Sequence, residues 1–334
     1  MGRFWITKAF AAFMICAAMA LPASAKTLWK VNILLTPESE LGLASAHFAK
    51  RVKELTNGEL EVDVFYNGQL GKNIPVVMQS LVSGDLDGFI ELLAYFGNWD
   101  KRQNIIACPY CFKSFEQFEA FLKSPMFQEM SGLIYDKGIK VVNSERMNWF
   151  KQEQRGVLMR KPVFLPDDLK PQKIRQYQAE MPIKGLMALG ANVQVIPWPD
   201  VYTALMTGTV DGLETTLAQT VQSKHVEAAK YFTTLELYYQ VVSPSFSRKS
   251  WEKLTDAQRK AVEQAIWEGG ELYKKESLRQ LQEYEKIAME QFDVKLIRVP
   301  LKPWIDKIKP AHEEFVKAGL IPKETIDYIA QLKY

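Results

Sequence analysis

The run LVSGDLDGF, residues 81–89, recurs 124 residues later as LMTGTVDGL, residues 205–213. Each run reads as the end of a helix, a glycine that stops it, and an Asp-Gly pair that leads into an apolar strand. A match this short can recur by chance among α/β proteins. Together with the rest of the chain, it predicts two similar α/β halves. Two lobes that close over a cleft are a common way to bury a small ligand.

The first 25 residues have the pattern of a secretory signal. Arg3 and Lys8 precede an uncharged apolar run over residues 9–21, and the sequence PASA at 22–25 supplies an Ala-x-Ala cleavage site. A transmembrane anchor is the competing interpretation, but it needs about 20 apolar residues. We therefore expect cleavage after Ala25, a periplasmic location, and no direct membrane insertion of the processed chain.

Length and charge narrow the class of protein. The chain carries 42 Lys and Arg residues against 39 Asp and Glu residues, and two of the basic residues lie in the signal segment. The processed chain is therefore close to neutral, and no nucleic-acid partner is expected. The residues after the signal suit two lobes of about 150 residues each. We predict lobe I at 26–150 plus about 241–280, and lobe II at 151–240 plus about 281–334.

Strand and helix patterns alternate along most of the chain. Strands are expected at 29–34, 59–66, 86–91, 139–142, 173–175, 193–196 and 209–214, and helices at 39–55, 74–83, 115–136, 182–189 and 199–207. This alternation is typical of sheets covered by helices. Residues 251–292 read as a mostly helical stretch with Thr255 as an N-cap, long enough to span both lobes.

Five motifs carry a family resemblance over nearly the whole processed chain: NGQLG at 67–71, RKPV at 160–163 with PDDL at 166–169, KIR at 173–175, ALGA at 188–191 and VYTALMTGTVDG at 201–212. In these the chain resembles the substrate-binding proteins of TRAP transporters, the DctP family. The resemblance implies an α/β, two-lobed periplasmic-binding-protein-like fold with a central cleft and a long helix across both lobes. It implies a receptor for a small organic acid that delivers its ligand to membrane permease subunits, with no catalysis and no cofactor.

The resemblance also indicates three ligand-binding residues in lobe II. Arg175 stands where the family carries its ligand-clamping arginine, and a guanidinium matches both oxygens of a carboxylate. A structural ion pair with Asp or Glu is the alternative role for Arg175. Arg155 matches a second arginine of the family cleft, although a solvated surface arginine is an equal alternative. Trp198 stands where the family often has a Phe against the ligand, with core packing as its alternative.

Five further positions complete the predicted site. Thr215 replaces an Asn that usually helps the family to hold the ligand carboxylate, and a hydroxyl can donate only one hydrogen bond. Glu91 and Tyr95 follow the first Asp-Gly pair as Thr215 follows the second, so pseudo-symmetry places them across the cleft. Gln178 and Leu34 also fall at cleft positions of the family.

These residues favour one class of ligand over others. Ionised Glu91 would repel a second ligand carboxylate, and Leu34 is apolar where the sugar-acid receptors of the family tend to be polar. The sequence therefore favours a monocarboxylate with an apolar or aromatic body, including an aromatic amino or keto acid. A C4-dicarboxylate or sugar-acid receptor is the alternative, and a ligand sensor for a membrane kinase remains open.

The sequence CPYC at 108–111 has the spacing of a redox motif. A periplasmic thiol oxidoreductase that uses Cys108 and Cys111 is therefore an alternative of another class. The motif lies where the family usually has PFLF, and the two thiols could equally form a disulfide or fill buried positions. His47, His225 and His312 lie far apart and show no metal-ligand spacing with the cysteines, so no metal site is predicted.

Overall fold

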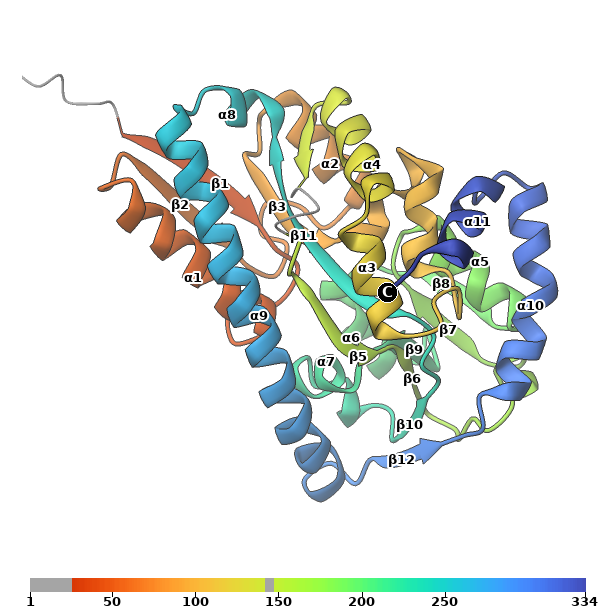
Figure 1. The fold of residues 1–334 in the computed structure, drawn as a ribbon. Coiled ribbons are helices and arrows are strands. Elements are labelled where there is room, and N and C mark those ends of the chain that lie inside the picture. The colour runs from red at the N-terminus through yellow and green to blue at the C-terminus, as the bar shows by residue number, and fades with distance from the viewer. Residues whose placement is uncertain (1–25, 142–146) are drawn as a thin grey trace, which may run out of the picture.

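The computed structural model describes residues 26–141 and 147–334, so the predicted signal peptide lies outside the described residues. Two α/β lobes lie side by side, and one long helix runs along the edge of both (Figure 1). The predicted two-lobed architecture is confirmed. Among the described helices, none combines the length and the apolar character that crossing a membrane would require.

The first lobe is built on a mixed sheet with strand order β2-β1-β3-β11-β4. Its strands are β1 (Thr27–Asn32), β2 (Leu60–Phe65), β3 (Gly88–Leu92), β4 (Ile139–Val141) and β11 (Tyr239–Ser247), and β5 (Phe150–Gln154) pairs with the far end of β11. The helices of this part of the chain are α1 (Glu40–Leu55), α2 (Ile74–Ser83), α3 (Phe115–Leu122), α4 (Pro125–Asp136) and α8 (Arg248–Glu252), with 3-10 segments η1 (Leu93–Asn98) and η2 (Lys101–Ala107).

The second lobe repeats this plan with strand order β12-β10-β6-β9-β7-β8. Its strands are β6 (Gly156–Met159), β7 (Lys173–Gln176), β8 (Asn192–Val195), β9 (Gly212–Thr215), β10 (Tyr231–Thr234) and β12 (Lys295–Arg298). The remaining elements are α5 (Glu180–Ala188), α6 (Val201–Met206), α7 (Leu217–Gln222), α10 (Lys302–Lys317) and α11 (Lys323–Gln331), with 3-10 turns η4 (Pro166–Leu169), η5 (Trp198–Asp200) and η6 (His225–Glu227).

The repeated sequence motif has the same structure in both lobes. Gly84 and Gly208 follow α2 and α6 in the left-handed conformation, with φ of +85° and +72°, which a glycine adopts without strain. Asp87 and Asp211 then each accept a hydrogen bond of 2.8 Å from a main-chain nitrogen, on β1 and β7 respectively. The motif therefore starts β3 and β9 in the same way in the two lobes.

The long helix α9 (Asp256–Glu290) holds the two lobes at one edge. Thr255 and Gln258 form a reciprocal capping box at its start. The helical stretch that the sequence predicts from residue 251 is therefore divided into α8 and α9. At 1.5 Å per residue its length is about 50 Å. Gly269 lets the helix approach Trp149 closely, since a Cβ atom there would lie 2.6 Å from the Trp149 ring.

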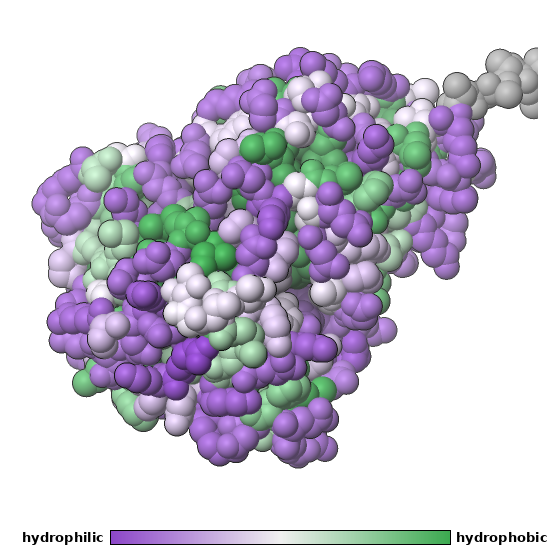
Figure 2. All heavy atoms as spheres, turned by 180° about the vertical axis from the view of Figure 1, so that it is seen from behind, coloured by the Kyte–Doolittle hydropathy of each residue, from purple (hydrophilic) through white to green (hydrophobic). Residues whose placement is uncertain are grey.

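The face of the molecule opposite to that seen in Figure 1 is mainly hydrophilic, and hydrophobic residues gather on it in small groups (Figure 2). Most large apolar side chains are buried in the cores beneath the two sheets. The burial of apolar area against both faces of each sheet supplies the main driving force for this architecture.

Candidate functional site

A cavity lies between the lobes, where β3, β7 and the crossing strand β11 meet. It is lined by Leu34, Leu35, Leu41, Glu91, Leu92 and Tyr95 from the first lobe, Arg155, Arg175, Tyr177, Trp198 and Gln219 from the second, and Gln240 and Val242 on β11. Its volume is about 30 Å³, which holds only one or two water molecules. The lobes are thus closed on each other, and a larger solute needs them to part or the side chains to rearrange.

Arg175 lies at the end of β7 and is 1% exposed. Its Nε donates a hydrogen bond of 2.8 Å to the main-chain oxygen of Ile196, which fixes one edge of the guanidinium. Among the carboxylates that the structure describes, none lies within ion-pair distance of this group. Burial, more than any neighbouring charge, lowers the pKa of Arg175 to about 10. The predicted alternative, a structural ion pair, is therefore not seen among these groups.

Arg155 is also buried, but a carboxylate already neutralises it. Its Nε pairs with Glu214, and its Nη1 donates a hydrogen bond of 2.6 Å to the side-chain oxygen of Gln240. The rings of Tyr177 and Tyr238 lie 5.3 and 5.8 Å from its guanidinium carbon. Although burial alone would lower it, the pKa of Arg155 is raised by Glu214. The surface alternative for Arg155 is wrong, since the residue is 2% exposed.

Glu91 and Tyr95 face the cavity from the first lobe, on β3 and η1. The Glu91 carboxyl group accepts hydrogen bonds from the main-chain nitrogens of Leu34 (3.1 Å) and Leu92 (3.2 Å). Burial outweighs these bonds and raises the pKa of Glu91 to about 7. Glu91 can therefore take up a proton more readily than an ordinary glutamate, and so it can either donate or accept a hydrogen bond.

The remaining predicted residues differ in their positions. Leu34 and Trp198 line the cavity, whereas Gln178 is exposed and does not. Thr215 is fully buried beneath the lining, and its hydroxyl donates a hydrogen bond of 2.8 Å to the side-chain oxygen of Gln219. Thr215 thus acts on the cavity through Gln219, whose amide nitrogen remains as a donor.

The lining residues that were missed from the sequence include two amides, Gln219 and Gln240. Gln219 follows Thr215 by four residues at the start of α7, and this spacing is the only sequence signal that could have found it. Gln240 lies on β11, a strand that the sequence pattern did not indicate and that crosses between the lobes. Both side chains are amides, which bind carboxylate, hydroxyl and carbonyl groups alike.

The structure corrects the prediction about histidines and cysteines. His312, on α10, lies with its Nε2 3.8 Å from the Sγ of Cys111, and Cys108 belongs to the same cluster. Sequence spacing gave no sign of this because α10 returns to the end of η2 from about 200 residues away. By contrast, His47 lies beside Glu268, and His225 packs against Trp198.

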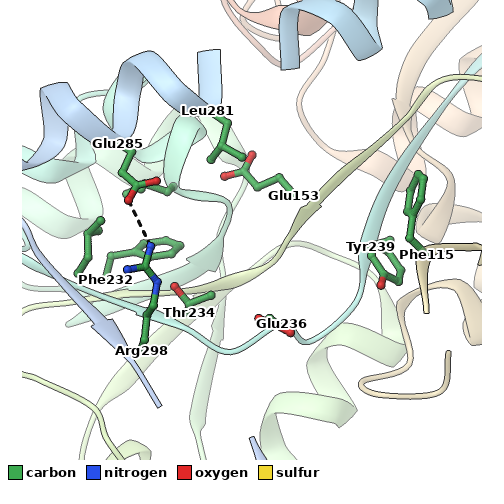
Figure 3. A pocket seen from close by; sticks show the side chains of 11 residues that line it. Phe115, Glu153, Phe232, Thr234, Glu236, Tyr239, Leu281, Glu285 and Arg298 are labelled. Atoms are coloured by element: carbon green, nitrogen blue, oxygen red, sulfur yellow. Dashed lines mark hydrogen bonds and ion pairs between the residues drawn. The ribbon is translucent and has the colours of Figure 1, made fainter. Parts of the chain in front are cut away.

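A larger cavity, about 380 Å³ in volume, lies on the side of the crossing strands that faces α9 (Figure 3). It is lined by Phe115, Glu153, Leu217, Phe232, Thr234, Glu236, Tyr239, Leu281, Glu285, Leu296 and Arg298. Arg298 already pairs with Glu285 at 3.3 Å, and Glu153 pairs with Lys151 at 3.2 Å, which leaves the carboxylate of Glu236 in excess among these lining residues. This charge balance opposes a ligand carboxylate, so the interlobe cavity is the better candidate for an acid.

Comparison with known proteins gives the same family as the sequence motifs. Residues 31–318 match the family model described as bacterial extracellular solute-binding protein, family 7 (DctP). The chain is 26% identical over 325 residues to the C4-dicarboxylate-binding periplasmic protein DctP of Rhodobacter capsulatus, covering 92% of both chains. It is 24% identical over 307 residues to the sialic acid-binding periplasmic protein SiaP of Vibrio cholerae, covering 90% of this chain and 92% of that protein.

Solved structures show the same architecture. A TRAP periplasmic solute-binding protein from Sulfurospirillum deleyianum with bound succinate superposes with a TM-score of 0.84 at 25% identity, covering 92% of this chain and all of that one. Another, from Sulfitobacter sp. NAS-14.1 with bound β-D-galacturonate, gives 0.83 at 22% identity, covering 92% and 99%. These relatives are binding proteins of transporters rather than enzymes, and the chain itself belongs to the DctP family of bacterial extracellular solute-binding proteins.

Proposed function

We propose that this protein is the periplasmic receptor of a TRAP transporter and that it captures a small monocarboxylate by pairing it with Arg175. The observation that carries the proposal is that Arg175 is buried and has no acidic partner among the described residues. A buried guanidinium without an acidic partner is costly, and a ligand carboxylate would supply the missing charge together with two parallel hydrogen bonds.

The balance of charge in the cavity favours one ligand carboxylate rather than two. Arg155 and Glu214 neutralise each other in a buried ion pair, and burial lowers the pKa of His225 to about 3, so that its ring adds no charge. Arg175 therefore carries the one positive charge that remains free among the described lining residues. A second carboxylate would find no cation left to pair with it, and Glu91 would repel it whenever Glu91 is ionised.

The lining favours a ligand body that is compact and largely apolar. Five aliphatic side chains and three aromatic rings surround the two arginines, namely Leu34, Leu35, Leu41, Leu92, Val242, Tyr95, Tyr177 and Trp198. Glu91, Gln219 and Gln240 can form hydrogen bonds with one additional polar group of the ligand, such as the keto or amino group of a 2-keto or amino acid. Polyhydroxylated acids, like the galacturonate of the Sulfitobacter structure, would leave hydroxyls against aliphatic walls.

Closing the lobes would remove water from the ion pair and strengthen it. We propose that the closed receptor then presents its ligand to the membrane permease subunits of the transporter. Export through the predicted signal peptide fits this role. A ligand sensor for a membrane kinase would use the same cleft, and genes for a permease next to this one would favour the transporter.

A thermal-shift screen of residues 26–334 against small acids, with neutral and cationic analogues, tests the proposal. A ligand that binds only the folded protein raises its melting temperature. We expect stabilisation by a monocarboxylate, and a loss of about 3 kcal/mol of binding free energy in Arg175→Ala, which is more than about a hundredfold in Kd by calorimetry.

The exposed arginine of α9, Arg279→Ala, is the matched control and should bind the acid as the wild type does. A response to neutral or cationic solutes alone would refute the carboxylate clamp. A preference for succinate over its monoacid analogues would refute the monocarboxylate assignment while leaving the receptor role intact.

A further inference from the structure

Two cysteines and one histidine that the proposed function does not use lie together outside the interlobe cavity. Cys108 and Cys111 follow η2, and His312 projects from α10. One ligand atom from each of the three, two sulfurs and an imidazole nitrogen, lies within 4.8 Å of the others. Cys108 is buried, whereas Cys111 and His312 are partly exposed.

The main chain between the two cysteines is held firmly in place. The main-chain nitrogen of Tyr110 donates a hydrogen bond of 2.9 Å to Leu237, and its hydroxyl donates one of 2.6 Å to Leu235. Pro109 packs against Gly185, where a Cβ atom would lie 2.7 Å from the proline ring. The spacing of the two sulfurs is therefore set by the fold before any ligand binds, which lowers the cost of binding.

We propose that Cys108, Cys111 and His312 form a binding site for a thiophilic metal ion of the Zn²⁺ type. Two thiolates and an imidazole are ligands that Zn²⁺ takes in proteins, with Zn–S near 2.3 Å and Zn–N near 2.0 Å. Tetrahedral geometry with these bond lengths separates sulfur from nitrogen by about 3.5 Å. The observed distance from Cys111 Sγ to His312 Nε2 is 3.8 Å, so binding needs little movement.

Three protein ligands leave the fourth position of a tetrahedral ion open. A cavity of about 160 Å³ adjoins Cys111 and His312 on this side and is otherwise lined by Ile105, Tyr110, Lys113, Gln117, Ile326, Ile329 and Ala330. It gives a path by which an ion can reach the two exposed ligands and offers space for water or a small anion as the fourth ligand. Cys108 is buried and does not line this cavity.

The protonation of the cluster fits metal binding at Cys111 and requires proton release from the other two ligands. A hydrogen bond from Cys108 is the main influence that lowers the pKa of Cys111 to about 6, and His312 adds to it. Nε2 of His312 also lies 2.9 Å from the main-chain oxygen of Pro109, so without metal it carries a proton for that oxygen. The ion would displace this proton and that of Cys108, as is usual for zinc ligands.

The test is a Zn²⁺ titration of residues 26–334, reduced, in competition with a chromophoric chelator, followed by Co²⁺ substitution. We expect one ion per chain with a Kd below about 1 µM and a thiolate-to-cobalt charge-transfer band. Cys111→Ser, Cys108→Ser and His312→Ala should each weaken Zn²⁺ binding by at least about tenfold. His47→Ala, which alters a histidine remote from the cluster, is the control and should bind Zn²⁺ normally.

Acid binding measured on the same variants reports whether they fold, because Arg175 lies in a different site. Variants that still bind the acid but no longer bind Zn²⁺ would support the metal site. Reduced protein that binds no Zn²⁺, or Zn²⁺ binding that survives Cys111→Ser, would overturn it. So would protein isolated from the periplasm with Cys108 and Cys111 joined as a disulfide, as shown by thiol alkylation and mass spectrometry.

Discussion

The guanidinium carbon of Arg175 lies 5.3 Å from the centre of the Trp198 ring. The indole also meets the His225 ring edge-on, with 5.0 Å between ring centres. Because Nε of Arg175 is bonded to the main chain, the ring and this hydrogen bond together fix the plane of the guanidinium. Trp198 therefore both positions the proposed anion-binding group and forms one apolar wall of the cavity.

Trp198→Ala should weaken binding of the acid about tenfold, because it removes a cation–π contact in a dry site together with apolar contact area. Trp198→Phe keeps a ring over the guanidinium and should lose less. Calorimetric titration of both variants measures the effect. If Trp198→Ala binds the acid as tightly as the wild type does, the ring has only a packing role.

The buried pair of Arg155 and Glu214 predicts a large effect on stability. Arg155→Met would leave the Glu214 carboxylate buried without a cation and should lower the free energy of unfolding by about 3–5 kcal/mol. Adding Glu214→Gln removes that unpaired charge and should restore a good part of the loss. Urea denaturation of the single and double variants measures both changes. If the double variant is no more stable than Arg155→Met, the unpaired charge of Glu214 is not the cause of the loss.

Glu91 predicts a dependence of stability on pH. Its pKa is about 7 in the folded protein, against 4.5 as the ordinary value. The contribution of Glu91 to stability is therefore most favourable below about pH 4.5, where the group is protonated in both states, and it becomes less favourable as pH rises towards 7. The loss amounts to about 3 kcal/mol.

Glu91→Gln should remove this part of the pH dependence. Its gain in unfolding free energy over the wild type should increase between pH 4.5 and 7.5 in urea titrations. A difference between the two proteins that stays constant over this range would mean that Glu91 ionises normally in the folded chain.

Local signals predicted a large part of the fold. The Asp-Gly repeat and the cap at Thr255 were confirmed because each depends on hydrogen bonds within a few residues of the chain or on a glycine conformation. The 3-10 segments η1 and η2 and the crossing strand β11 were not predicted. Their sequences lack a regular apolar period, and tertiary contacts decide their conformation.

The candidate site was harder to predict than the fold. Family position placed Arg175 and Trp198 at the cavity, but it could not show that Arg155 already has a partner in Glu214. Gln178 lies only three residues after Arg175 and is nevertheless exposed. Which side of a loop faces the cleft depends on how the lobes pack, and the approach of His312 to the cysteines depends on the path of α10. Neither leaves a local pattern in the sequence.

Thr215 and Gln219 should act as a coupled pair in ligand binding. The hydroxyl of Thr215 occupies the amide oxygen of Gln219, and this bond turns the amide nitrogen into the donor that the cavity can use. Thr215→Val keeps the shape of the side chain but frees the amide to rotate, and we expect it to weaken acid binding by roughly 3–10-fold. Gln219→Ala should cost at least as much, because it removes the donor itself.

The double variant should bind about as weakly as Gln219→Ala alone, since the hydroxyl has nothing left to orient. A double-mutant cycle by calorimetry, in which the coupling free energy between the two positions is about 1 kcal/mol, would support this relationship. Additive losses would mean that Thr215 contacts the ligand directly, as the family position of its replaced Asn suggests. The lobes would then have to rearrange around the ligand enough to expose a side chain that is fully buried in the closed form.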